Sequence, residues 1–151
     1  MTVAEKIPPP EPAEKDAGRE EWIHAVDTLI EEVTAWSHLQ GWRTVARETQ
    51  IVDETTQQEY TTLVLDIITE ADYSGLCREV KLVVEPIFFD AARRSSRVDF
   101  SVWPTLYDVI LLYETSRHDW TMRGDPRFRW PSSWNQESFQ VIAEGLLEMG
   151  R

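Results

Sequence analysis

The feature that most constrains this chain is a long stretch, residues 42 to 123, in which apolar side chains tend to recur at every second position. Such alternation, in segments rich in β-branched and aromatic residues, is typical of β-strands. No helical pattern interrupts the stretch, and short connections between consecutive strands favour antiparallel pairing. We therefore predict an antiparallel sheet of five or six strands, formed by residues 42–52, 60–69, 80–89, 97–103, 106–113 and 119–123.

Two places within this stretch carry a more specific expectation. Pro86 cannot donate a hydrogen bond to a neighbouring strand, so it should lie at a strand end, a bulge or a sheet edge. Residues 115–119 form a short polar run between the last two segments and predict a hairpin turn.

An amphipathic helix is predicted on each side of the sheet segments. Residues 19–38 carry large apolar side chains three and four positions apart, and Gly41 marks the exit from this helix. A second stripe near the end of the chain consists of Phe139, Ile142, Ala143, Leu146 and Leu147. Ser133 with Gln136 can cap this second helix, and Asn135 is an alternative cap. The predicted fold is α+β, a two-layer sandwich in which both helices share one face of the sheet.

Length and composition predict one domain and a cytoplasmic protein. The 151 residues suffice for a single core, which we assign to residues 19–151, and residues 1–18 are expected to form a flexible, Pro-rich, acidic leader. The sequence has no signal-peptide pattern and no apolar run long enough to span a membrane. Cys77 is the only cysteine, and no Cys/His cluster has zinc spacing, so neither a disulfide nor a cofactor is expected.

The charge is strongly negative and unevenly distributed. The net charge of −12 opposes binding to nucleic acid or to an anionic membrane surface. Residues 1–75 hold 16 acidic and 5 basic side chains, whereas residues 76–151 hold 11 and 10, the latter almost all arginine. A local site for an acidic partner in the second half is therefore possible, because arginine suits planar, bidentate contacts.

The second face of the sheet also raises a question. Residues 60–69 and 106–113 are apolar on both sides, and strands of that kind are usually covered on both sides. The second face either packs on a partner, such as another copy of the chain, or is covered because the sheet curls into a half barrel. Asp66 lies among apolar neighbours on this face, and we expect it to meet an arginine such as Arg43 or Arg47.

A candidate binding patch lies before the last helix, where the sequence reads GDPRFRWPSSW. In an extended segment, the two arginines would point to one face and Phe128 and Trp130 to the other. The aromatic side chains either close the core or border an arginine surface for acidic peptides. The candidate binding residues are Arg123, Arg127, Arg129, Trp130 and Trp134.

One enzymatic pattern is present. Asp66 on one predicted strand and Glu79-Val80-Lys81 at the start of the next resemble the metal-binding core of PD-(D/E)xK nucleases. The resemblance implies that Asp66 and Glu79 hold a divalent ion and that Lys81 helps to position the attacking water. That family has a helix after the Glu-x-Lys strand, whereas here another strand follows.

The element order and the acidity are broadly similar to those of small bacterial secretion chaperones, many of which are acidic homodimers that wrap a client segment. Those chaperones usually have a helix between their strands, which this sequence lacks. The sequence favours a non-enzymatic protein-binding module of bacterial type, chaperone- or adaptor-like or part of a larger complex, with a protein partner or a second copy as its ligand. The alternative is a metal-dependent nuclease or other small hydrolase that uses Asp66, Glu79 and Lys81.

Overall fold

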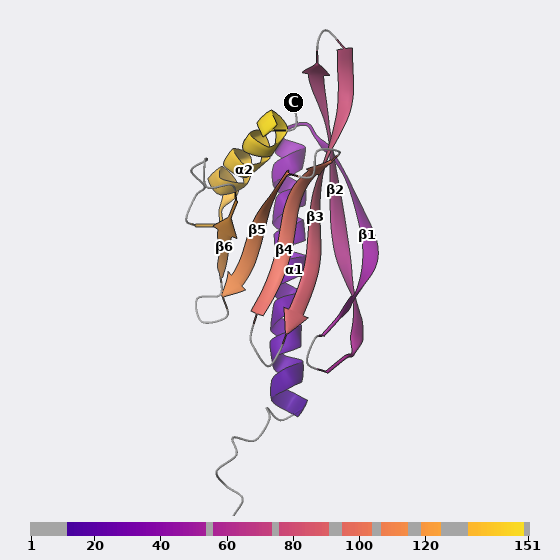
Figure 1. Ribbon diagram of the computed structural model, residues 1–151, viewed down its shortest axis with the longest axis vertical. Coiled ribbons are helices and arrows are strands. Elements are labelled where there is room, and N and C mark those ends of the chain that lie inside the picture. The colour runs from indigo at the N-terminus through magenta and orange to yellow at the C-terminus, as the bar shows by residue number, and fades with distance from the viewer. Residues whose placement is uncertain are drawn as a thin grey trace, which may run out of the picture.

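A single antiparallel sheet with one helix at each end of the chain forms the fold (Figure 1). A computed structural model describes residues 12–53, 56–73, 76–90, 95–103, 107–114, 119–124 and 133–149. The elements are α1 (Pro12–Leu39), β1 (Arg43–Val52), β2 (Glu59–Tyr73), β3 (Leu76–Asp90), β4 (Ser95–Trp103), β5 (Tyr107–Glu114), β6 (Asp119–Arg123) and α2 (Gln136–Met149). The six strands lie in sequence order, and each pairs antiparallel with the next. The predicted α+β fold is confirmed.

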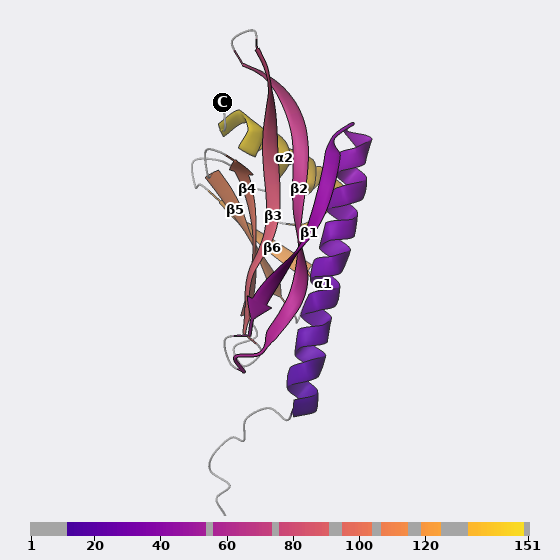
Figure 2. The same ribbon diagram turned by 90° about the vertical axis from the view of Figure 1, so that its right-hand side faces the viewer.

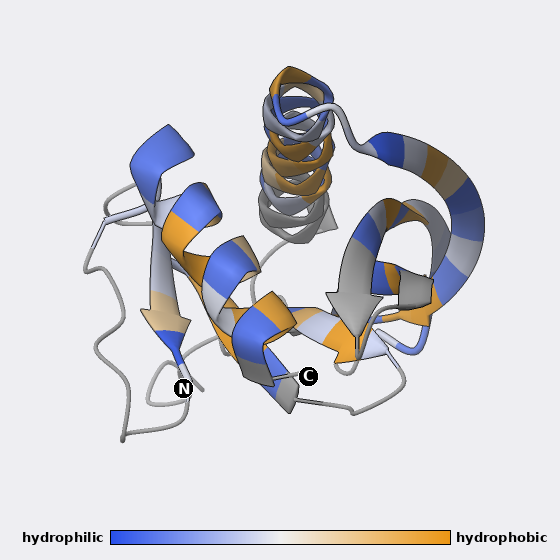
Figure 3. Ribbon diagram, turned by 90° about the horizontal axis from the view of Figure 1, so that it is seen from above, coloured by the Kyte–Doolittle hydropathy of each residue, from blue (hydrophilic) through white to orange (hydrophobic). Residues whose placement is uncertain are grey.

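The two helices cover the same side of the sheet, which we call the inner face (Figure 3). Alternate strand residues point to this side and are buried with the apolar stripes of both helices. In β2, β3 and β4 these residues are Leu65, Ile67, Val80, Leu82, Val84, Val98, Phe100 and Val102. The opposite side of the sheet, which we call the outer face, is turned toward the viewer in Figure 1 and has no helix on it.

An aromatic cluster joins both helices to the sheet. The ring of Phe139 on α2 lies 5.7 Å from Trp36 on α1, 6.4 Å from Trp42 and 5.9 Å from Phe100 on β4, measured between ring centroids. Phe139 is buried, and burying a side chain of this size stabilises the fold by about 1.5 to 3 kcal/mol. The predicted apolar stripe on the last helix therefore reaches the centre of the core.

The first helix is longer than its apolar pattern indicated. It begins at Pro12, whereas the pattern predicted a start at Arg19. Proline is tolerated in the first turn of a helix, where its missing N–H would have no partner, and Ala, Glu and Lys in the following residues are good helix formers. The helix exit at Gly41 is confirmed, because this glycine has a φ of 80° and its N–H donates to the His38 carbonyl oxygen.

The cap of the last helix is Asn135, and the capping box predicted from Ser133 and Gln136 is wrong. The Asn135 side-chain oxygen accepts a hydrogen bond from the Ser138 backbone N–H at 2.8 Å. The Ser138 hydroxyl donates to the Ser133 carbonyl oxygen, so Ser133 contributes its backbone rather than its side chain. Asparagine is as good an N-cap as serine, and its position directly before Gln136 decides between the two.

Strands β2 and β3 are longer than predicted and extend past the rest of the sheet as a hairpin (Figure 1). The pairing of β2 with β3 ends at Leu65 and Val84, so the last part of β3 has only β4 as a ladder partner. Pro86 lies in this part, next to a register shift between Pro86 and Phe88. The predicted bulge is confirmed, since a residue without an N–H fits where one side of the strand is unpaired.

Strands β5 and β6 pair from Glu114 and Asp119, as a hairpin requires. The turn was predicted at residues 115–119, of which 115–118 lie outside the described residues and Asp119 is the first residue of β6. Residues 1–11 of the predicted leader also lie outside the described residues. Within the described ranges, neither helix combines the length and the apolar character needed to cross a membrane.

Candidate binding face of the sheet

The outer face is built from the strand residues that alternate with the core residues. The register places Arg43, Ile68, Lys81 and Trp103 in one row across β1 to β4. Val45, Asp66, Val83, Ser101 and Asp108 form the next row, across β1 to β5. Apolar and charged side chains are therefore mixed on this face, whereas the buried inner-face residues of β2 to β4 are mostly apolar.

Asp66 lies at the centre of one charged group. Its side chain is only 10% exposed, and its Oδ2 accepts a hydrogen bond from Arg47 Nε at 3.1 Å. Lys81 Nζ lies 4.0 Å from the same oxygen. The expectation that an arginine would meet Asp66 is confirmed, with Arg47 in that role and not Arg43. Two cations beside one buried carboxylate offset the free energy that burial of this charge costs.

The other oxygen of Asp66, Oδ1, is buried and has no hydrogen-bond partner within the described part of the chain. Val64, two residues earlier on the same side of β2, is also buried. Leu65 and Ile67 are buried on the inner face, so β2 is covered on both sides here, as its apolar pattern predicted.

Glu79 lies on the outer face with Asp66 and Lys81 but has a different partner. It forms an ion pair of 3.7 Å with Arg43, and both side chains are mostly exposed. The structure therefore brings Asp66 and Lys81 together, and it pairs each carboxylate with an arginine. Among the residues that the structure describes, no three His, Cys, Asp or Glu side chains are grouped so that they could hold a metal ion.

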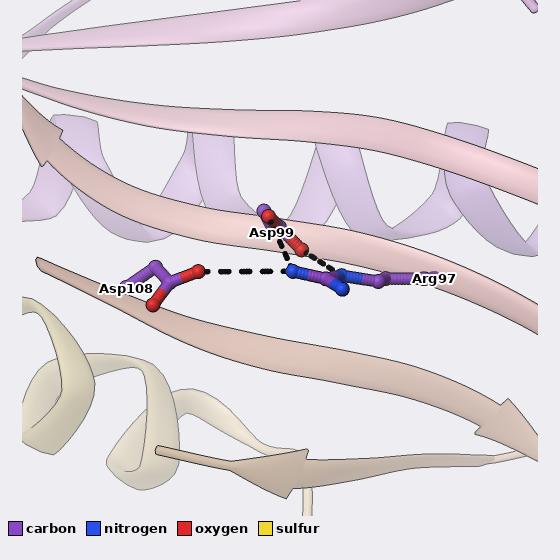
Figure 4. Close-up of polar contacts among 3 residues, drawn as sticks. All are labelled: Arg97, Asp99 and Asp108. Atoms are coloured by element: carbon purple, nitrogen blue, oxygen red, sulfur yellow. Dashed lines mark hydrogen bonds and ion pairs between the residues drawn. The ribbon is translucent and has the colours of Figure 1, made fainter. Parts of the chain in front are cut away.

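A second charged group lies on β4 and β5 (Figure 4). Arg97 donates two hydrogen bonds to Asp99, from Nε at 2.6 Å and from Nη2 at 3.0 Å. Its Nη2 also lies 3.8 Å from Asp108 on the neighbouring strand. The hydrogen bond to Asp99 raises the pKa of Arg97, against the opposing effect of burial. This bidentate pair fixes the direction of the guanidinium group across the face.

Three large apolar side chains on the outer face are exposed to solvent. Trp103 at the end of β4 is 59% exposed, Val45 on β1 is 50% exposed and Ile87 on β3 is 41% exposed. Trp103 pairs across the strands with Lys81, and Ile68 follows in the same row. An exposed tryptophan beside a lysine has the composition of a binding hot spot.

The predicted Arg/Trp patch is described only in part. Arg123 is exposed at the end of β6, while Trp134 is half-buried with its ring centroid 5.6 Å from that of Trp36. Trp134 thus adds to the aromatic cluster, as core closure requires. Arg127, Arg129 and Trp130 lie outside the described residues, so a binding role for them stays a prediction.

Trp103 and the group formed by Arg97, Asp99 and Asp108 were not predicted as site residues from the sequence. A signal was present, because Arg97, Asp99, Ser101 and Trp103 alternate with Val98, Phe100 and Val102. The alternation predicts that the first set shares the outer face. It does not reveal that Asp108 on the next strand faces Arg97.

Comparison with known proteins adds no relationship to this geometry. No protein-family model, no curated protein and no solved structure matches the chain.

Proposed function

We propose that this protein is a non-enzymatic, cytoplasmic, protein-binding module of bacterial type, chaperone- or adaptor-like or a subunit of a larger complex, that acts as a homodimer. The observation that carries the proposal is Trp103, which is 59% exposed on a sheet face without a helix. Tryptophan is costly to leave in water and is enriched among the side chains that dominate binding energy at protein interfaces.

The charge of the outer face supports a protein as the ligand. Its described basic side chains are Arg43, Arg47, Lys81, Arg97 and Arg123. Its described acidic side chains are Asp66, Glu70, Glu79, Glu85, Asp99, Asp108 and Asp119. This near balance, in a chain with a net charge of −12, offers no continuous basic surface for a phosphate backbone or an anionic membrane. Mixed charges around exposed apolar groups suit the polar rim and apolar centre of a protein interface.

Differential capture of proteins from a native cell extract tests the proposal. The tagged full chain is compared with Trp103→Ser and with Leu39→Ser, a matched control that removes an apolar side chain 72% exposed at the end of α1. We expect a protein retained by the wild type and by Leu39→Ser but lost with Trp103→Ser. Circular dichroism must first show that the two variants are folded alike. If all three chains capture the same proteins, or if no chain captures any protein, the outer face is not the binding surface.

The alternative function is a metal-dependent nuclease or other small hydrolase that uses Asp66, Glu79 and Lys81. It draws support from the shared face of these residues and from the 4.0 Å separation of Lys81 and Asp66. We place it second because Arg47 and Arg43 already pair with its two carboxylates, and a cation beside a carboxylate opposes metal binding.

A further inference from the structure

Strand β1 forms an open edge of the sheet. Within the described part of the chain it pairs with β2 alone, and its other edge has no strand. Consecutive residues Val45, Ala46, Arg47 and Glu48 are exposed, so both faces of the strand meet solvent at its middle. Figure 2 looks toward this edge, and α1 runs beside β1 without crossing in front of it. The edge is therefore accessible to another segment of extended chain.

Most of the devices that block pairing at a sheet edge are missing from β1. Such devices include a short strand, a proline, a bulge and charged side chains. β1 has 10 residues, contains no proline and pairs with β2 without a register shift, whereas β6 at the opposite edge has only 5 residues. The backbone N–H and C=O groups on its open side can therefore hydrogen-bond to a further strand, and its charged side chains decide which strand fits.

The charges of β1 are sorted between its two sides. Arg43 and Arg47 lie on the outer face with Val45 between them, whereas Glu48 lies on the opposite side of the strand. Antiparallel pairing of β1 with β1 of a second copy would set residues of the same side against each other. No register of that pairing joins an arginine to the glutamate, so these charges do not favour a second copy at the edge. They favour a strand that carries acidic side chains on its outer side.

Both arginines keep donors for a further carboxylate. Arg47 is 54% exposed, and it bonds to Asp66 through Nε, so its terminal nitrogens have no acceptor among the described residues. Arg43 is 70% exposed, and its ion pair with Glu79 spans 3.7 Å. Arginine has five N–H donors, and both of these carboxylates belong to strands on the side away from the open edge. A carboxylate on an added strand would reach the guanidinium groups from the other side.

We infer that the β1 edge binds an extended segment of a partner protein in which two acidic side chains, four residues apart, flank an apolar one. The acidic side chains would lie opposite Arg43 and Arg47, and the apolar side chain would cover Val45, which is 50% exposed. Directly opposed side chains on paired strands have Cβ atoms about 4.5 to 5.5 Å apart, which is close enough for ion pairs. Backbone hydrogen bonds would supply affinity, and the alternate side chains would supply specificity.

The inference rests on the proposed protein-binding function and names the kind of segment that a partner would present. It uses a surface separate from Trp103, which lies on β4 at the far end of the row that begins with Arg43. Binding at the edge and binding at Trp103 can therefore be tested separately.

Fluorescence anisotropy of labelled synthetic peptides with the full chain tests the charge match. The first peptide is Thr-Glu-Thr-Val-Thr-Glu-Thr, whose acids can lie opposite Arg43 and Arg47 in either strand direction. The control, Glu-Thr-Thr-Val-Thr-Thr-Glu, has the same composition, but no register brings both of its acids opposite the two arginines. We expect saturable binding of the first peptide and binding of the control that is weaker by about 1.4- to 5-fold, the effect of losing one cross-strand ion pair.

A charge reversal tests the same contact from the protein side. Arg43→Glu replaces a favourable cross-strand pair by an unfavourable one, so the dissociation constant of the first peptide should rise about 2- to 30-fold. The fold should tolerate this variant because the ion pair of Arg43 with Glu79 is exposed. The double variant Gln140→Glu/Val141→Glu changes the net charge by the same amount on the exposed side of α2, and it should leave the constant unchanged.

Two N-methylated forms of the first peptide test the strand pairing itself. Alternate amides of a strand point to opposite edges, so methylation of one set removes the hydrogen bonds to β1, whereas the other set faces solvent. We expect one form to lose binding and the other form to keep it.

The outcomes separate this inference from the proposed function. No saturable binding of the first peptide, equal binding of the two sequences, or equal effects of the two N-methylated forms would overturn the inference. A protein captured from cell extract and lost with Trp103→Ser would leave the proposed function standing even then. A dimer that dissociates with Arg43→Glu while the wild type binds neither peptide would place a second copy at this edge, which would also overturn the inference.

Discussion

Replacement of Arg47 by methionine should destabilise the chain through Asp66, although Arg47 itself lies half in solvent. The variant keeps most of the aliphatic length of the side chain and removes the 3.1 Å hydrogen bond to Oδ2. The Asp66 carboxylate is 10% exposed, and its Oδ1 has no partner among the described residues. Of the described cations, Lys81 at 4.0 Å would then be the one left beside it.

The size of the effect follows from the burial of the two partners. Breaking a fully buried ion pair costs about 3 to 5 kcal/mol, and losing a hydrogen bond to a charged group costs about 1.5 to 3 kcal/mol. Because Arg47 is 54% exposed, solvent screens the pair and the lower range applies. We expect Arg47→Met to reduce the free energy of unfolding by roughly 1.5 to 3 kcal/mol.

Equilibrium unfolding in urea, followed by circular dichroism, measures this loss at concentrations where wild type and variants have the same mass. Asp66→Asn removes the buried charge, so Arg47→Met should cost under about 1 kcal/mol in that background. Arg43→Met is the matched control, and it should cost at most about 1 kcal/mol because its pair with Glu79 is exposed. Equal losses for Arg47→Met and Arg43→Met, or no coupling between Arg47 and Asp66, would refute the reasoning.

Three further predictions concern the core, the pH dependence and metal binding. Phe139→Ala should lower the unfolding free energy in urea by about 3 to 5 kcal/mol, because it empties the centre of the aromatic cluster; a loss under 1 kcal/mol would contradict the packing. Burial and the nearby Asp119 raise the pKa of Glu32 above its ordinary value of 4.5, so the contribution of Glu32 to stability falls as the pH rises through the raised pKa. Glu32→Gln should therefore be more stable than wild type at neutral pH but not below pH 4.5. Melting temperatures of both proteins across this pH range test the prediction, and a variant that is stabilised only at low pH would contradict it. Mg²⁺ or Mn²⁺ should leave the melting temperature unchanged, whereas a saturable rise that Asp66→Asn abolishes would favour the hydrolase alternative.

The fold was predictable because its elements are local and periodic. Each strand shows alternation in the sequence, and short connections lead to a sheet in sequence order with antiparallel neighbours. The apolar stripes of the helices identified their buried sides, including Phe139. The start of α1 was missed because residues 12–18 have no apolar stripe, and a helix can form there on backbone propensity alone.

The candidate site was less predictable because it depends on contacts between strands. Asp66 was identified as a buried charge, but the choice between Arg43 and Arg47 follows from the β1–β2 register and the reach of each side chain. Alternation with buried residues places Trp103 on the outer face, but it does not show that Trp103 is exposed there, because Val64 and Asp66 on the same face are buried.

The central claim is that this protein is an interaction module that forms a homodimer. Light scattering of the full chain over a wide range of protein concentration tests this claim most directly. We predict that the mass of the wild type rises from 17.6 kDa to twice that value as the protein concentration increases. A wild-type mass of 17.6 kDa at every concentration would contradict it.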